Sequence, residues 1–208
     1  MARAFAKISI CFLCGKVHTQ RPPVCDFCLN ALYSLRGNSV GRRELKSRSL
    51  WLWQNSSPRA FFELSHAMKQ SEVADWCVFA EWMCESFRLP KSGVLVPAPS
   101  RRWGTKDHAW CLAKALSNLT GFPLKNILAR KGGLQQKHLK KSDRVQFKAE
   151  LIDPDWQCSD YTTVIIVDDI LTTGSTARGC LEALCYPKRY EVWTLIDRAP
   201  CGGTPLLI

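Results

Sequence analysis

The chain has 208 residues, of which 46% are hydrophobic and 23% are charged, a composition that excludes disordered and collagen-like proteins. Its 29 lysines and arginines outnumber 18 aspartates and glutamates, for a net charge of +11. Such an excess favours a polyanionic partner: nucleic acid, a phosphorylated metabolite or anionic lipid. No segment approaches the roughly 20 apolar residues of a membrane helix. Eleven cysteines in a chain of this size suit a reducing compartment, so we expect a cytoplasmic protein without a membrane span.

Four cysteines near the start of the chain form two pairs at metal-ligand spacing. They are Cys11, Cys14, Cys25 and Cys28. Two such pairs can place four thiolates at the corners of a tetrahedron, which predicts a Zn²⁺ site of the zinc-ribbon kind. The zinc would be structural, because four thiolates leave no open position for chemistry. The alternatives are redox thiols or cysteines that merely pack, and His18 could replace one thiol.

Residues 36–59 have the glycine, serine and proline content of a linker. They also hold a basic group made of Arg42, Arg43, Lys46 and Arg48. Trp51 and Trp53 lie beside these cations. Aromatic rings among arginines can stack on single-stranded bases. Alternatively, they attach a small N-terminal module to the rest of the protein.

From residue 60 onward, helical and extended patterns alternate. Apolar spacing predicts helices over 73–87, 109–119 and 175–185, and strands over 93–97, 124–128, 162–167 and 190–196. The strand over 162–167 is almost wholly apolar and β-branched, which is typical of a strand buried on both faces of a parallel sheet. The alternation predicts an α/β fold with an open, mostly parallel sheet flanked by helices.

The last of the buried residues in that strand leads into two adjacent carboxylates, Asp168 and Asp169. A loop of hydroxyls around a glycine follows: Thr172, Thr173, Gly174, Ser175 and Thr176. Backbone N–H groups at the start of the next helix can cradle a phosphate. The adjacent carboxylates would repel each other unless they shared hydroxyl donors or a cation, which a ribose diol with Mg²⁺ nearby supplies. The stretch predicts a ribose 5-phosphate site, the alternative being a plain strand–turn–helix with surface aspartates.

The same stretch resembles the 5-phosphoribosyl-1-diphosphate (PRPP) motif of type I phosphoribosyltransferases: four apolar residues, two acidic, two apolar, then Thr-Thr-Gly-x-Thr. The resemblance implies that Asp168 and Asp169 hold the ribose hydroxyls and that residues 172–176 hold the 5′-phosphate. It also implies a type I phosphoribosyltransferase-like sheet and Mg²⁺ as the ion that accompanies PRPP.

With its two cysteine pairs in front of this motif, nearly the whole chain resembles the ComF family of competence-associated proteins. Further similarities are His66-Ala-Met-Lys69, Val96-Pro-Ala-Pro99 and Gln136-x2-Leu139-x4-Arg144, whereas the family's R-G-F-N-Q-A stretch reads Gly104-Thr-Lys-Asp-His-Ala109. The resemblance implies a zinc-ribbon head and basic linker over 1–48 and a phosphoribosyltransferase-like domain over 49–208. It also implies a role in natural competence and DNA uptake, with proteins of the competence machinery as possible partners.

Further polar groups are candidates for the remainder of the site. Arg101 and Arg102 follow a predicted strand and suit bidentate contact with diphosphate; the alternative is an ordinary surface turn. The resemblance implies a lid over PRPP, carrying Lys137, Lys140, Lys141 and Arg144. A solvated loop and a contact to the DNA backbone are equally open for that segment. His108 is either a general acid or base or a structural histidine at a helix start.

Two functions follow from these patterns. The first is a Mg²⁺-dependent phosphoribosyltransferase that displaces diphosphate from PRPP, stabilised by metal and arginine and without a covalent residue. The second is a protein that handles single-stranded DNA during transformation and reuses the fold. The sequence identifies neither the acceptor nor a catalytic residue.

Overall fold

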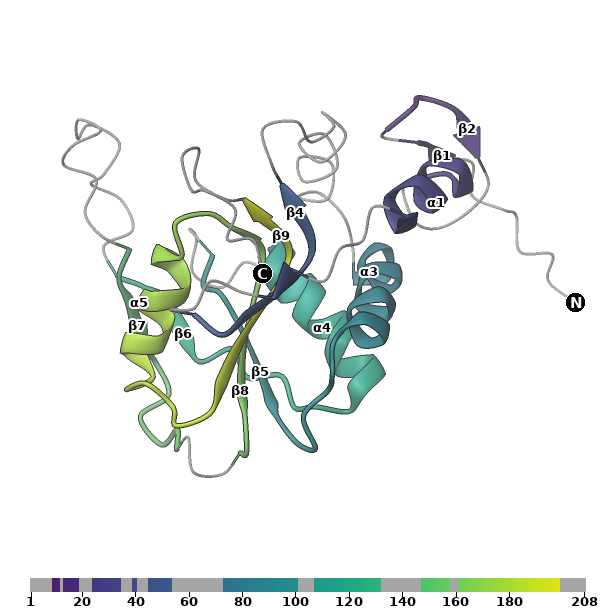
Figure 1. Cartoon of the computed structure of the whole chain (residues 1–208). Helices are drawn as coiled ribbons and strands as arrows, with labels where there is room; N and C mark the ends of the chain where they lie inside the picture. Colours follow the sequence, from purple (N-terminus) through teal and green to yellow (C-terminus); the bar gives the residue numbers. More distant parts are fainter. Residues whose placement is uncertain are drawn as a thin grey trace, which may run out of the picture.

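A central parallel sheet flanked by helices forms the body of the protein (Figure 1). The computed structural model describes residues 9–11, 13–18, 24–34, 39–40, 45–53, 73–100, 107–131, 147–157 and 161–198. In sheet order, the strands are β3 (Ser39–Val40), β4 (Ser47–Trp53), β9 (Tyr190–Arg198), β8 (Val164–Leu171) and β5 (Val94–Pro97). Every neighbouring pair is parallel except β3 and β4. The predicted α/β fold with a mostly parallel sheet is confirmed.

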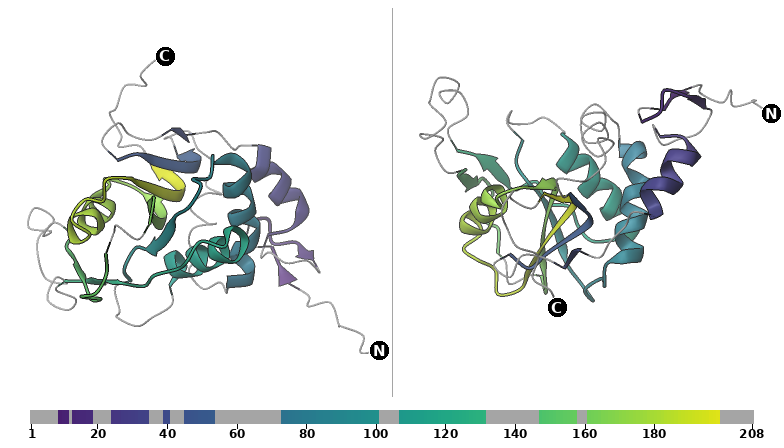
Figure 2. Two further views of the ribbon diagram at one scale, coloured as in Figure 1. Left: turned by 90° about the horizontal axis from the view of Figure 1, so that it is seen from below. Right: turned by 45° about the horizontal axis from the view of Figure 1, so that its top comes forward.

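Helices cover both faces of this sheet. They are α3 (Val73–Ser86) and α4 (His108–Thr120) on one face and α5 (Ser175–Ala183) on the other, as Figures 1 and 2 show. Ile165 and Val167 of β8 join the core beneath α3 and α4, and Val164 and Ile166 join the core beneath α5. Successive side chains of a strand point to opposite faces. A strand covered on both sides therefore needs an unbroken apolar run, which is what the sequence of β8 shows.

The predicted helices are present, and their ends follow from local chemistry. Asp107 precedes α4 and its carboxylate accepts a hydrogen bond from the backbone N–H of Trp110 at 3.3 Å, which is the usual helix cap. Gly121 ends the helix in the left-handed conformation, with φ of 73°, and donates its N–H to Ser117. None of the helices in the described ranges is long and apolar enough to cross a bilayer.

The strand expected over 124–128 is wrong. Leu124 makes a single bridge to Leu95, and the strand β6 (Leu128–Arg130) begins where the expected one ends. β6 pairs antiparallel with β7 (Ala149–Leu151) in a separate two-stranded sheet. The proline at 123 and the lysine and asparagine that follow Leu124 interrupt the apolar run, so extended pairing begins only after them.

β4 overturns the interpretation of residues 47–53 as linker. It runs parallel to β9, from Ser47 opposite Val192 to Trp53 opposite Arg198. Two of its polar residues have partners on β9: the Ser49 and Thr194 hydroxyls lie 2.6 Å apart, and the Arg48 guanidinium lies 2.9 Å from the Glu191 carboxylate. These partners lie far away in the sequence, so the composition of the segment alone suggests exposure. The division of the chain at residue 48 stays a prediction, and β4 spans that position.

Trp51 attaches the N-terminal helix α1 (Asp26–Ser34) to the body. Its side chain is fully buried and its indole N–H donates to the carbonyl of Leu32 at 3.0 Å. Edge-to-face contacts join the ring to Phe79 and Trp82 of α3, with centroids 5.9 and 6.1 Å apart. A buried ring cannot stack on a base, so that hypothesis is wrong for Trp51. The alternative, attachment of the module, is the one that the structure confirms.

We predict that Trp51→Phe lowers the free energy of unfolding by about 2–4 kcal/mol, because it leaves a cavity and an unpaired buried carbonyl. The matched variant Trp53→Phe, at a half-buried ring, should cost less than about 1 kcal/mol. Urea unfolding followed by circular dichroism measures both. Equal small losses would contradict the packing described for Trp51.

Candidate functional site

The four N-terminal cysteines converge on one point. Their sulfur atoms all lie within 4.8 Å of one another, and the Cys14 and Cys25 sulfurs are 3.6 Å apart. A tetrahedral zinc site with Zn–S bonds of about 2.3 Å has sulfur–sulfur edges of about 3.8 Å. The cluster predicted from the sequence is therefore present, and its geometry could hold a metal ion such as Zn²⁺.

Short-range backbone contacts shape this cluster. Gly15, in the left-handed region with φ of 71°, donates its N–H to the carbonyl of Cys11 at 2.8 Å and closes the first pair. This turn joins β1 (Ser9–Ile10) to β2 (Val17–His18), while the second pair lies at the start of α1. Burial opposes ionisation of Cys11, but hydrogen bonds from the backbone of Cys25 and Cys14 lower its pKa to about 6. His18 is not part of the ligand group.

We predict one Zn²⁺ per chain at this cluster. Metal analysis of the purified protein should give a stoichiometry near one. Cys25→Ser should lose the metal and lower the melting temperature, because metal binding and folding of so small a module are coupled. The buried Cys180→Ser, outside the module, serves as the matched control and should keep full zinc. A Cys25→Ser protein with full zinc and unchanged stability would contradict the assignment.

Asp168 and Asp169, which we call the acidic turn, lie at the carboxyl end of β8. The strand extends to Leu171, so Asp168 and Asp169 are its last polar residues and not the start of a loop. Alternation along the strand places Asp168 in the pocket on the α5 side. Asp169 instead meets the first residue of α4, with its carboxylate oxygen 3.4 Å from the Nε2 of His108. The edge beyond the carboxyl ends of parallel strands is where open α/β sheets bind ligands.

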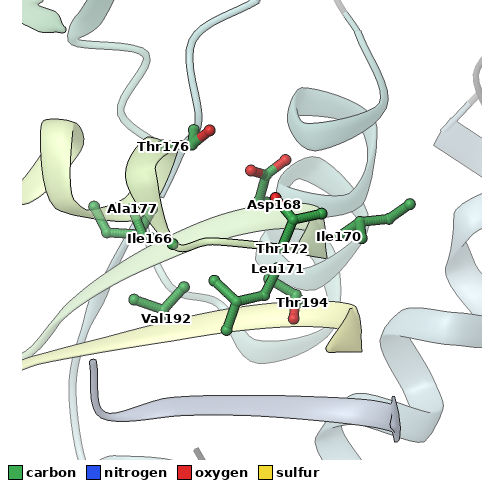
Figure 3. Close-up of a pocket in the computed structure, with 10 residues that line it drawn as sticks. Ile166, Asp168, Ile170, Leu171, Thr172, Thr176, Ala177, Val192 and Thr194 are labelled. Carbon is green, nitrogen blue, oxygen red and sulfur yellow. The ribbon is translucent and has the colours of Figure 1, made fainter. Parts of the chain in front are cut away.

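Figure 3 shows the pocket beside this turn, with the Asp168 carboxylate and the Thr176 hydroxyl on the same side of β8. The pocket is lined by Ile166, Asp168, Ile170, Leu171, Thr172, Gly174, Thr176, Ala177, Val192 and Thr194. Its enclosed volume of about 10 Å³ has room for one water molecule. Its lining combines hydrophobic side chains of the sheet with the polar groups of Asp168, Thr172, Thr176 and Thr194.

The loop between β8 and α5 ends at Gly174, directly before the first backbone N–H groups of the helix. Gly174 stands at the cap position with φ of 77°, and no side chain caps the helix there. The N–H of Ser175 donates to the hydroxyl of Thr173 at 3.3 Å. A Cβ at residue 174 would collide with the side chain of Leu45. Only glycine fits this turn, and the uncapped N-terminus of α5 is suited to an anion.

Arg178, in the first turn of α5, contacts this loop. The sequence analysis did not predict this contact. Its guanidinium donates to the carbonyl of Thr173 at 2.7 Å, and its backbone N–H donates to Gly174 at 2.9 Å. A residue one helical turn beyond the cap points back toward the N-terminus of the helix. The spacing from Gly174 to Arg178 is the signal that could have found it.

His108 is placed in the site by the start of α4. Burial disfavours its imidazolium form, but the hydrogen bond and charge of Asp169 outweigh that cost and raise the pKa of His108. Burial likewise opposes ionisation of Asp169, and His108 outweighs it and lowers the pKa of Asp169. Burial and repulsion by Asp169 raise the pKa of Asp168 well above its usual range. The contact between His108 and Asp169 therefore favours the imidazolium and the carboxylate together, and Asp168 is the carboxyl that retains a proton more readily.

Several predicted residues lie outside the described part of the chain. They are Arg101, Arg102, Lys137, Lys140, Lys141 and Arg144, together with Arg42, Arg43 and the His66–Lys69 and Gln136–Arg144 matches. The described residues before Arg101 leave β5 beside the end of β8, where the N–H of Ala98 donates to Val167 at 2.8 Å. Of the predicted PRPP-binding residues, the structure brings together Asp168, Asp169 and the loop 172–176.

Fold and site together define a class of protein. It is an α/β protein with a four-thiol module and with two adjacent carboxylates beside an uncapped helix N-terminus. No protein-family model and no curated protein matches the chain. Among solved structures, the chain is similar to a purine phosphoribosyltransferase from Pyrococcus horikoshii Ot3. The two share 19% sequence identity, with a TM-score of 0.38, over 65% of this chain and 92% of that chain.

Replacing Asp168 or Asp169 by the neutral residue asparagine should change the stability of the protein in opposite directions. Because folding raises the pKa of Asp168, its ionisation costs stability as the pH rises through the folded value. Asp168→Asn should thus stabilise the ligand-free protein at pH 7 by about 1 kcal/mol, or about 2–4 °C, and the gain should vanish near pH 4. Asp169, whose pKa is lowered, contributes stability above its unfolded value, so Asp169→Asn should destabilise at pH 7.

Thermal unfolding at several pH values, in buffer without added divalent cations, measures both variants. Destabilisation by Asp168→Asn at pH 7 would contradict the burial of that carboxylate.

Proposed function

We propose that the pocket at the carboxyl end of β8 binds PRPP together with Mg²⁺ and that the protein transfers the phosphoribosyl group. One observation carries the proposal: the Asp168 carboxylate of β8 and the uncapped start of α5 meet at one pocket. The Asp168 carboxylate and the Thr176 hydroxyl point to the same side of the strand (Figure 3). An acceptor for a sugar hydroxyl thus stands next to a donor for a phosphate, which supports a ribose 5-phosphate as the ligand.

Each group has a distinct task in this proposal. The backbone N–H groups and hydroxyls of residues 172–176 hold the 5′-phosphate, with the dipole of α5 in support. Arg178 lies against the same loop and adds positive charge. The ionised Asp169 and its neighbour Asp168 accept hydrogen bonds from the ribose hydroxyls. Arg101 and Arg102 contact the diphosphate, and the lid with Lys137, Lys140, Lys141 and Arg144 excludes water.

The carboxylates fit the oxygen ligands that Mg²⁺ prefers. When bound with PRPP, the ion supplies charge that stabilises the departing diphosphate. In the transfer, the bond from ribose C1 to a diphosphate oxygen breaks and a bond from C1 to the acceptor forms. The pair of electrons from the broken bond leaves with the diphosphate. The protein's contribution is orientation and charge, since no nucleophilic side chain is required.

The resemblance of the chain to the ComF family supports a cytoplasmic role in natural competence and DNA uptake, with proteins of the competence machinery as partners. It also supports a division into a head with linker over 1–48 and a phosphoribosyltransferase-like domain over 49–208. The four-thiol cluster at the N-terminus agrees with a zinc-ribbon head in that division.

Single-stranded DNA is the alternative ligand, favoured by the net charge of +11. The described residues weaken this DNA-binding alternative at the side chains that suggested it most specifically. Trp51 is buried, and Arg48 is engaged with Glu191. The exposed Lys46 lies over the ring of Tyr190, 5.6 Å from its centre. Because the acidic turn has no role in binding a polyanionic strand, we favour PRPP.

We predict that PRPP binding requires the acidic turn. Calorimetry with Mg²⁺ should detect binding by the wild type and none by the double variant Asp168→Asn/Asp169→Asn. The matched control Asp153→Asn/Asp155→Asn makes the same charge change in a turn outside the pocket and should bind PRPP normally. Diphosphate release with a panel of acceptors then tests the transfer itself.

Unchanged PRPP affinity in the Asp168/Asp169 variant would show that the ribose site is elsewhere. The DNA alternative predicts a different pattern. The wild type would bind labelled single strands more tightly than about 10⁻⁴ M at physiological salt, and the more positive double variant would bind them at least as tightly.

A further inference from the structure

His108 gives the acidic turn a ligand that Mg²⁺ does not ordinarily use. Mg²⁺ is bound by oxygen atoms, whereas imidazole nitrogen combined with carboxylate oxygen suits first-row transition metals. We propose that His108, Asp168 and Asp169 directly bind a divalent transition-metal ion, of the Mn²⁺ class, in the absence of any substrate. The inference goes beyond the proposed function, because it needs no PRPP and the two can fail separately.

The donor atoms are already close to coordination geometry. One ligand atom of each residue lies within 4.8 Å of the other two. The Nε2 of His108 and the Oδ1 of Asp169 are 3.4 Å apart. An octahedral ion such as Mn²⁺, with bonds of about 2.1 Å at right angles, would place neighbouring ligands about 3.0 Å apart. Rotation of the Asp168 carboxylate, which borders the pocket, would complete the set.

Two elements hold these ligands rigidly. His108 is the first residue of α4, which Asp107 caps, and both aspartates belong to β8, which pairs with β9 on one side and β5 on the other. Backbone N–H groups orient the carboxylates: Asp169 donates to Asp168 at 2.9 Å, and Ile170 donates to Asp169 at 2.8 Å. Ligands on rigid elements are the arrangement that metal sites need.

The excess of negative charge around His108 also favours binding of a cation. Three carboxylates, those of Asp107, Asp168 and Asp169, act on His108 and are themselves partly buried. Protonated His108 contributes at most one positive charge against them. Burial of charged groups without compensation is unfavourable. A divalent ion beside the neutral imidazole compensates this concentration of carboxylates, which occurs in a chain whose overall charge is strongly positive.

The experiment uses the full chain with its cysteine cluster loaded with zinc, and Mn²⁺ alone as the probe. Mn²⁺ avoids thiolates, so the cysteine cluster does not compete for it. Titration followed by electron paramagnetic resonance should give one bound Mn²⁺ per chain. Pulsed measurements should show coupling of the ion to an imidazole nitrogen. His108→Asn should remove this coupling and weaken Mn²⁺ binding by at least about tenfold.

His18→Asn, at the other described histidine, is the matched control and should keep both the affinity and the coupling. Two results would overturn the proposal: no binding of Mn²⁺ to the wild type, or unchanged affinity and nitrogen coupling in His108→Asn. If the variant fails to fold, the wild-type spectrum decides, because absence of nitrogen coupling there excludes His108 as a ligand. PRPP is not added in any arm, so failure of PRPP binding leaves these results unaffected.

Discussion

Repulsion between two carboxylates at the end of a buried strand is the constraint around which the site is built. Asp168 and Asp169 are adjacent in β8, whose other residues serve the core. The Asp168 carboxylate borders the pocket beside α5 and the Asp169 carboxylate lies against the start of α4, while the two remain within 4.8 Å of each other. At the start of α4, the Nε2 of His108 lies 3.4 Å from the Asp169 carboxylate. Asp168 is left with a raised pKa, and that unfavourable charge is what a bound cation or sugar diol would relieve.

The N-terminal module is connected to this site through packing. Trp51 bonds to the carbonyl of Leu32 in α1, and its strand β4 pairs with β9, the neighbour of β8. Leu45, just before β4, fills the space where a side chain at Gly174 would stand. The chain that leaves the cysteine cluster thus helps to shape both the sheet and the phosphate-binding loop. A change in the module that moved this chain would reach the loop through Leu45.

Signals contained within one segment could be predicted from the sequence. The apolar run of β8, the apolar spacing of α4 and the spacing of the four cysteines each depend on neighbours in the chain. β4 could not be predicted, because Ser49 and Arg48 are satisfied by Thr194 and Glu191, which lie about 140 residues away. When those partners are unknown, a segment that contains serine and arginine is predicted to be exposed to solvent.

The same limit applies to the site. The turn at Asp168 and Asp169 was visible as a motif, but the role of His108 was left open because its partner Asp169 lies on another element. Arg178 was missed although its spacing from Gly174 is local, since arginine on a helix surface usually has no specific task. A pairing across elements decided the role of His108, whereas the role of Arg178 follows from local contacts with Thr173 and Gly174.

A crystal structure of the protein with PRPP and a divalent cation tests the central claim most directly. The account predicts the 5′-phosphate on the backbone N–H groups at the start of α5 and the ribose hydroxyls on Asp168 and Asp169. A PRPP molecule bound elsewhere, with the acidic turn unchanged and without ligand, would contradict it.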